Sequence, residues 1–144
     1  MARNPAPGES DVEALVKRLK APDPQVRLRA AADLGALGRK ARKAVRTPAL
    51  ALKDESAHVR KMAALALGDI GPGAEAASPA LAEALAHDDE AVRRRAAIAL
   101  GEIGSGEAVP AVRGALGDRS EGVRKAAALA LALLTPGGVR GRAA

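Results

Sequence analysis

Few residues in this 144-residue chain could perform catalysis or hold a metal ion. The segment AHDDE, residues 86–90, places His87 beside three carboxylates, and such a cluster could bind a divalent cation. Asp89, however, stands where a helix should begin, and its side chain is expected to cap that helix. The chain has two histidines, no cysteine and no tyrosine, and it lacks G-x-S-x-G, P-loop and HExxH spacings. We therefore expect no enzyme activity, no cofactor and no metal site.

Basic side chains exceed acidic ones, which bears on the partner. The chain has 23 Lys and Arg against 17 Asp and Glu, a net charge of +6 and an isoelectric point near 10.3. This balance favours anionic partners such as acidic proteins or nucleic acid. Five cations lie in GRKARKAVR, residues 38–46, which we interpret as a solvated junction between helices. Because the sequence has no run of 18 apolar residues and no secretory signal, we expect a cytoplasmic protein without a membrane partner.

One pattern occurs four times and predicts the elements that position these side chains. VRLRAAADLGALG, VRKMAALALGDIG and VRRRAAIALGEIG begin at Val26, Val59 and Val92, and a fourth copy begins at Val123. With each Val as position 0, apolar residues recur at positions 4, 8 and 11, the buried stripe of an amphipathic helix. A Ser or Asp three residues before each Val can cap the helix start, and Gly follows its end in three copies. Each copy therefore predicts one well-delimited helix.

A shorter apolar pattern precedes each of these helices and predicts a partner helix. It includes a Leu seven residues before each of the four Val residues, namely Leu19, Leu52, Leu85 and Leu116. The repeating unit is thus helix–turn–helix. With no Phe, Tyr or Trp, its core must be built from small aliphatic side chains, which suits closely packed helices. The predicted helices are 11–20, 24–37, 42–53, 57–70, 75–86, 90–103, 107–116 and 121–134.

The pattern D/S-x-x-V-R-x-x-A-A-x-x-L-G-x-I/L-G resembles the short HEAT-like repeats of the phycobilisome-lyase type. The resemblance covers about residues 10–136 and implies an all-α, right-handed solenoid whose second helices line the concave side. Its repeats would span about 10–38, 39–71, 72–104 and 105–136, while residues 1–9 and the basic tail 137–144 look disordered. The resemblance also implies that the Arg at position 1 joins an Asp–Arg ladder between repeats. A Ser cap in two copies argues against a complete ladder.

Positions that vary between the copies point to a binding surface. Positions 2, 3, 6 and 10 lie opposite the buried stripe, on the side that the resemblance places in the groove. Position 6 carries Leu65, Ile98 and Leu129, and a contiguous exposed apolar row usually marks a contact site. The alternative is that curvature half-buries this row and that the cations only keep the face hydrated. The candidate binding residues are Leu28, Arg29, Lys61, Met62, Leu65, Arg94, Arg95, Ile98, Lys125 and Leu129.

These features favour a non-enzymatic protein-binding module or scaffold. In this hypothesis the aliphatic row anchors an acidic, partly apolar peptide or partner surface, and the groove cations select its charge. One alternative is duplex nucleic acid on the basic face, since the absence of aromatic residues disfavours single strands. Another is an accessory subunit of a lyase or other enzyme. The last predicted helix is apolar around much of its circumference, which indicates either that the array once continued or that this end packs against a partner or by self-association.

Overall fold

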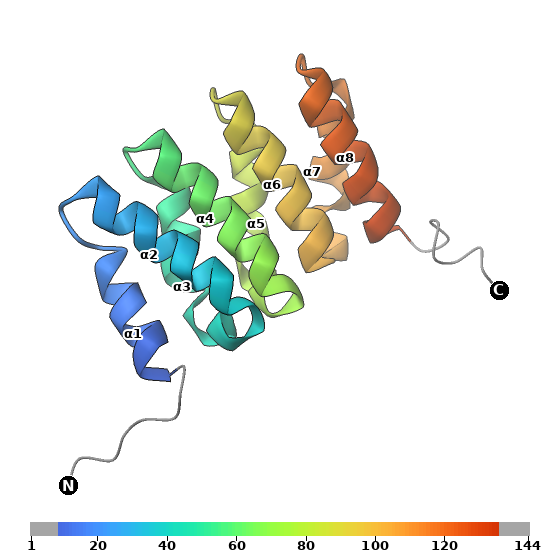
Figure 1. Ribbon diagram of the computed structural model, residues 1–144. Helices are drawn as coiled ribbons and strands as arrows, with labels where there is room; N and C mark the ends of the chain where they lie inside the picture. Colours follow the sequence, from blue (N-terminus) through green and yellow to red (C-terminus); the bar gives the residue numbers. More distant parts are fainter. Residues whose placement is uncertain (1–8, 136–144) are drawn as a thin grey trace, which may run out of the picture.

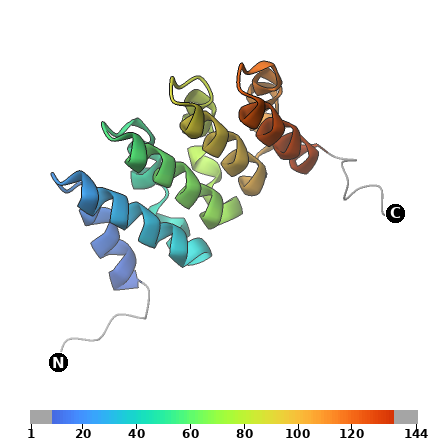
Figure 2. The ribbon, with the colours of Figure 1, turned by 45° about the horizontal axis from the view of Figure 1, so that its top comes forward.

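The computed structural model describes residues 9–135, and every regular element in that range is helical. Four long helices lie side by side in one layer, and α3 (Arg46–Leu50), α5 (Ser78–Ala84) and α7 (Val109–Gly114) lie behind them, while α1 (Glu9–Arg18) lies beside the first long helix (Figure 1). The long helices step along the molecule in chain order (Figure 2). The predicted all-α solenoid is confirmed. The long second helices are α2 (Pro24–Leu37), α4 (Ala57–Ile70), α6 (Glu90–Ile103) and α8 (Glu121–Leu134).

The predicted disordered ends fall almost wholly outside this description. Residues 1–8 and 136–144 are not described, so the prediction for 137–144 lies outside the described residues. Glu9 differs from the prediction, because α1 begins at this residue.

The second helices begin and end where the sequence predicts, because local capping fixes both ends. The side chains of Asp23 and Asp89 accept hydrogen bonds of 2.8 Å from backbone N–H groups of the first turn. Ser56 and Ser120 accept longer bonds of 3.4 Å in the same way. At the other end, Gly38, Gly71 and Gly104 have φ values of 55°, 77° and 79°. A side chain is strained at positive φ, so glycine is suited to these three stops.

Three of the first helices, α3, α5 and α7, are shorter than predicted because prolines limit where they can begin, whereas α1 has the predicted ten residues. Proline has no N–H, and its ring clashes with the carbonyl four residues earlier, so it fits only the first helical turn. Pro79 is accordingly the second residue of α5, and Pro110 is the second residue of α7. The continuous helices predicted over 42–53, 75–86 and 107–116 are therefore wrong. Short 3-10 segments flank these helices, at Gly38–Ala44, Ala51–Lys53, Gly71–Ala77, Gly106–Ala108 and Ala115–Gly117.

Small residues let consecutive second helices approach closely. A Cβ atom built on Gly68 would lie 3.2 Å from Cα of Ala99, and one built on Gly101 would lie 2.9 Å from Cα of Ala130. Both distances are shorter than ordinary carbon–carbon contact, so a larger side chain would push the helices apart. Ala97 is fully buried beside this contact. The predicted packing role of the small residues is confirmed.

The two ends of the solenoid are covered less completely than the middle. Val26 is 36% exposed, whereas its counterparts Val59, Val92 and Val123 are fully buried. The prediction that Val26 belongs to the buried stripe is therefore wrong. The reason is its place at the edge: α2 packs against α1 and α4, but within the described residues no earlier second helix covers its other flank.

Candidate functional site

The ten predicted binding residues all lie on the second helices and on their exposed side, which we name the binding face. Arg29, Arg94, Lys125 and Leu129 are exposed. None of the other six is enclosed between the layers, and all are partly accessible. These six are Leu28, Lys61, Met62, Leu65, Arg95 and Ile98.

The aliphatic row at position 6 is less exposed than the sequence indicates. Leu129 is 70% exposed, but Leu65 and Ile98 are half-buried. The close packing of neighbouring helices explains this difference, because it partly covers side chains on either flank of the row. Of the two alternatives for this row, half-burial is found for Leu65 and Ile98, whereas Leu129 is exposed.

The cations of the binding face are concentrated at positions 2 and 3. Among the described side chains, no carboxylate lies within 4.0 Å of the charged groups of Arg29, Lys61 or Arg94. Lys125 instead pairs with Glu121 at 3.1 Å, and both side chains are exposed. Such an exposed pair contributes little stability and opens readily. Three cations are thus available to an incoming anion without breaking an ion pair.

Carboxylates occupy position 10 of the same face. Asp69 and Glu102 each lie over a glycine of the preceding helix, with Glu102 Oε2 only 2.7 Å from a Cβ built on Gly68. Burial raises the pKa of Asp69, and burial followed by the nearby Asp69 charge raises the pKa of Glu102. The positive charge of Arg95 opposes both shifts. Arg95 is therefore partly neutralised within the face.

The binding face consequently carries two charge rows. The basic row, at positions 2 and 3, lies near the helix N-termini, where the helix dipole is also positive. The acidic row, at position 10, lies about 11 Å further along the helices, given a rise of about 1.5 Å per residue. An acidic segment crossing the helices is therefore attracted to the basic row and repelled by the other. The sequence contains the residues of both rows, but only the side-by-side packing of the helices shows that these residues line up into rows.

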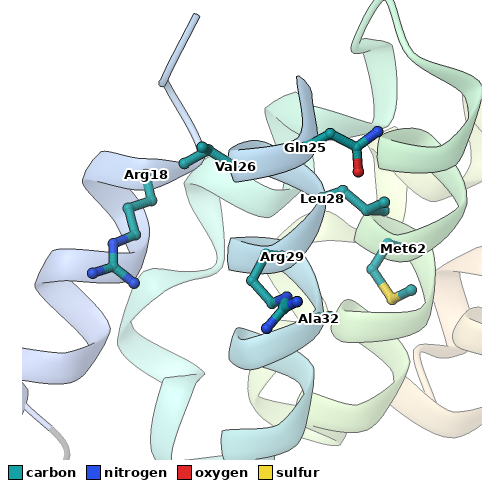
Figure 3. Close-up of a pocket in the computed structure, with 7 residues that line it drawn as sticks. All are labelled: Arg18, Gln25, Val26, Leu28, Arg29, Ala32 and Met62. Carbon is teal, nitrogen blue, oxygen red and sulfur yellow. The ribbon is translucent and has the colours of Figure 1, made fainter. Parts of the chain in front are cut away.

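An open hollow of about 620 Å³ lies at the N-terminal end of the binding face (Figure 3). Leu28 from α2 and Met62 from α4 are neighbouring apolar side chains of its floor. Arg18 from α1 and Arg29 from α2 bring two cations to it. The hollow thus combines an apolar floor with positive charge. The other lining residues are Gln25, Val26 and Ala32.

A ladder of arginine and aspartate joins successive repeats along the loops before the second helices. Arg27 Nε donates to Asp54 Oδ2 at 2.8 Å, and Arg93 Nε donates to Asp118 Oδ2 at 2.8 Å. In both pairs a second guanidinium nitrogen donates to the other carboxylate oxygen, at 3.1 and 3.2 Å. The fork geometry makes these strong, oriented pairs. The ladder that the resemblance implies is therefore present at Arg27 and Arg93.

The acid of the ladder is not the residue that caps the second helix. It stands two residues earlier, so a Ser cap at Ser56 or Ser120 does not interrupt the ladder. The signal was present in the sequence, since the column reads Ala21, Asp54, His87 and Asp118.

One rung is missing because His87 occupies the acid position of the third repeat. Arg60 donates from Nη1 to the backbone oxygens of Asp54 and Glu55, at 2.6 and 3.2 Å. Its Nε is buried and has no partner in the described part of the chain. His87 Nδ1 accepts the N–H of Asp89 at 3.0 Å and so reproduces only the turn-forming half of an aspartate's role. The joint between α4 and α6 is therefore held by packing without the cross-link.

Within 9–135, no group of three or more His, Cys, Asp or Glu side chains is placed to hold a metal ion. No helix in that range has the length and apolar character needed to cross a membrane.

Comparison with known proteins identifies the family. The family model for HEAT repeats matches residues 12–98 and 78–141. Among curated proteins, none matches the sequence. Similar solved structures include two engineered proteins, with TM-scores of 0.71 and 0.74, identities of 31% and 27%, and coverage of 88% and 91% of this chain. The chain spans 63% and 66% of their lengths.

Two further solved structures share the fold. A designed armadillo repeat protein in complex with the peptide (KR)4 has a TM-score of 0.74 at 22% identity, covering 86% of this chain and 64% of its own. The complex of CpcE and CpcF of phycocyanin lyase from Nostoc sp. has a TM-score of 0.61 at 25% identity, covering 99% and 73%. The repeated capping, the small-residue contacts and the family match agree, and the chain belongs to the HEAT repeat family.

Proposed function

We propose that the chain is a protein-binding module whose binding face takes an acidic, partly apolar segment of a partner. The observation that carries this proposal is the hollow, where Arg18 and Arg29 stand beside an apolar floor of Leu28 and Met62. An aliphatic side chain followed by a carboxylate is complementary to such a site, because its apolar part leaves water while its charge meets a cation.

The basic row sets the path along which the segment would cross the second helices. From the hollow, Lys61 and Arg94 continue the basic row over α4 and α6. An extended peptide crossing the second helices along this row meets one or two cations per repeat. The designed armadillo protein of the same fold was solved with a basic peptide. We infer the opposite preference here, because this binding face presents cations along its accessible row.

The acidic row favours a protein partner over duplex nucleic acid. Asp69 and Glu102 lie on the same face as the cations, about 11 Å away, and a duplex about 20 Å across would bring phosphates near both rows. A peptide is narrow enough to use the basic row alone. The exposed Leu129 is also poorly suited to a phosphate backbone.

Isothermal titration with two model peptides tests the proposal. One peptide alternates glutamate with leucine over eight residues, and the other replaces each glutamate by lysine. We expect the acidic peptide to bind and the basic peptide not to bind. Arg29→Glu should weaken acidic-peptide binding by about tenfold, since reversing one charge in a partly desolvated site changes the free energy by about 1–2 kcal/mol.

The matched control is Arg46→Glu, the same charge reversal at an exposed residue of α3, in the layer away from the binding face. It should leave the dissociation constant within about twofold. Equal weakening by both variants would mean that net charge alone drives binding, and the proposed site would be wrong. Tighter binding of duplex DNA than of the acidic peptide at physiological salt would also contradict it.

A further inference from the structure

The C-terminal end of the solenoid leaves accessible several residues whose counterparts are wholly or partly covered where another repeat follows. Ala128 is exposed, whereas its counterpart Ala97 is fully buried. Leu116 is 41% exposed, whereas its counterpart Leu52 is 3% exposed. We name Leu116, Ala128, Leu129 and Ala132 the end face. This surface continues the contact that joins α2 to α4, α4 to α6 and α6 to α8.

The N-terminal end carries a different surface and does not complement the end face. There α1 covers the inner flank of α2, so that Ala30 is only 1% exposed. The outward side of α1 is charged, with Asp11, Glu13, Lys17 and Arg18 all exposed. Docking this surface on the end face would take charges out of water without partners. Head-to-tail stacking of copies is therefore disfavoured.

We propose that two copies of this chain associate through their end faces, with α8 packed against α8 of the second copy around a two-fold axis. Small residues allow close helix approach here as they do inside the array, since Ala128 and Ala132 lie one turn apart on the same side of α8. Each copy then covers the apolar surface that the other leaves open. The contact is isologous and closes at two copies.

Charge selects the antiparallel arrangement of the two helices. Arg124 and Lys125 are both exposed near the start of α8. A parallel pair would bring the four cations of the two copies together, only partly offset by Glu121 beside Lys125, whereas an antiparallel pair places them beside the last turn of the partner helix. The free carbonyls of that turn carry partial negative charge, which favours the cations.

The dimer should be weak because its interface is small. A single 14-residue helix with one flanking leucine buries much less than the roughly 800 Å² per partner of a typical stable interface. We therefore expect a dissociation constant on the order of 100 µM. Sedimentation from about 5 to about 500 µM should show a concentration-dependent shift from the 14.5 kDa chain toward twice that mass.

Ala128→Glu tests the surface, and Ala14→Glu is its matched control. Both residues are exposed on helices, so neither substitution should disturb folding, which circular dichroism checks. The first variant should stay monomeric at every concentration, and the second should dimerise like the parent chain. A parent chain that is monomeric throughout, an Ala128→Glu dimer, or equal disruption by both variants would overturn the proposal.

The chain has no cysteine, so a single introduced thiol reports the geometry directly. In the antiparallel pair Ala128→Cys lies near the two-fold axis and should form an intermolecular disulfide on oxidation, whereas Ala14→Cys should not. Equal cross-linking of the two variants would indicate random collision and contradict the arrangement. Arg29→Glu should dimerise normally, so failure of peptide binding and failure of dimerisation are distinguishable.

Discussion

Replacing His87 by aspartate should complete the ladder at the joint between α4 and α6. The new carboxylate would stand at the place that Asp54 and Asp118 hold in the neighbouring rungs. Like those residues, it can accept the backbone N–H two residues later, so the turn before α6 is preserved. It also offers two oxygens to the guanidinium of Arg60, whose Nε has no partner among the described residues.

The size of the effect follows from how deeply the rungs lie. In the Arg27–Asp54 pair the side chains are 14% and 11% exposed, so the pair is neither buried nor free in water. Leaving a buried donor unpaired costs about 1–3 kcal/mol, and satisfying Arg60 recovers part of this. Repulsion from Asp88 and Asp89 and desolvation of the new charge oppose the gain. We expect a net increase in the free energy of unfolding of about 1–2 kcal/mol.

Thermal and urea denaturation measure this change. For a chain of this length 1 kcal/mol corresponds to about 4 °C in Tm, so Tm should rise by about 4–8 °C. His87→Asn is the control, because it keeps an oxygen acceptor for the turn without the charge, and it should leave Tm nearly unchanged. In an Arg60→Gln background, His87→Asp should lose most of its gain, which isolates the pairwise interaction.

Two results would refute this reasoning. Equal stabilisation by aspartate and asparagine would place the effect in the turn and not in the ladder. An unchanged gain in the Arg60→Gln background would show that the new carboxylate acts on some other group. Either outcome would mean that the joint is not weakened by the missing rung.

Three further perturbations test the packing and the charges. Gly101→Ala should lower the free energy of unfolding by about 1–2 kcal/mol in urea titration despite its higher helix propensity, because the new Cβ meets Cα of Ala130 at 2.9 Å. The hydrogen bond from Arg93 lowers the pKa of Asp118 below 3.8, so the stability it contributes above about pH 4 is lost as the pH falls through the lowered pKa. Asp118→Asn should accordingly reduce the loss of stability on acidification. Burial raises the pKa of Glu102 above 4.5, so ionisation of this carboxyl destabilises the fold as the pH rises. Glu102→Gln should therefore stabilise the fold at pH 7 more than at pH 4.

The second helices could be predicted because their determinants are local. Asp23 sits within three residues of the turn it caps, and Gly38 follows the last residue of the helix it ends. The first helices could not be predicted to the same degree. Prolines such as Pro79 allow an α-helix to begin nearby but do not say what precedes it, and the 3-10 segments are decided by packing against the neighbouring repeat.

In the candidate site, too, features set by a single helix could be predicted, whereas features set by contacts between repeats could not. The helical wheel placed Arg94 and Leu129 on the outward side correctly, because that side is a property of one helix. Half-burial of Leu65 and Ile98 depends on the distance between consecutive helices, which is set by contacts across repeats. The acid of the ladder was misidentified for a related reason: Arg27 and Asp54 are 27 residues apart, and only superposition of the repeats shows that they meet.

The missing rung and the binding face are linked through the joint between α4 and α6. Lys61 lies on one side of this joint and Arg94 on the other, so the spacing of the basic row depends on how firmly these two helices are held. In repeat proteins stability is approximately a sum of repeat and interface terms, so the interface without a rung is a weak one. Segmental opening should therefore concentrate there rather than at the rung of Arg93 and Asp118. Because the rung at His87 is missing, the spacing between α4 and α6 can adjust, and an extended partner would lie over this part of the solenoid.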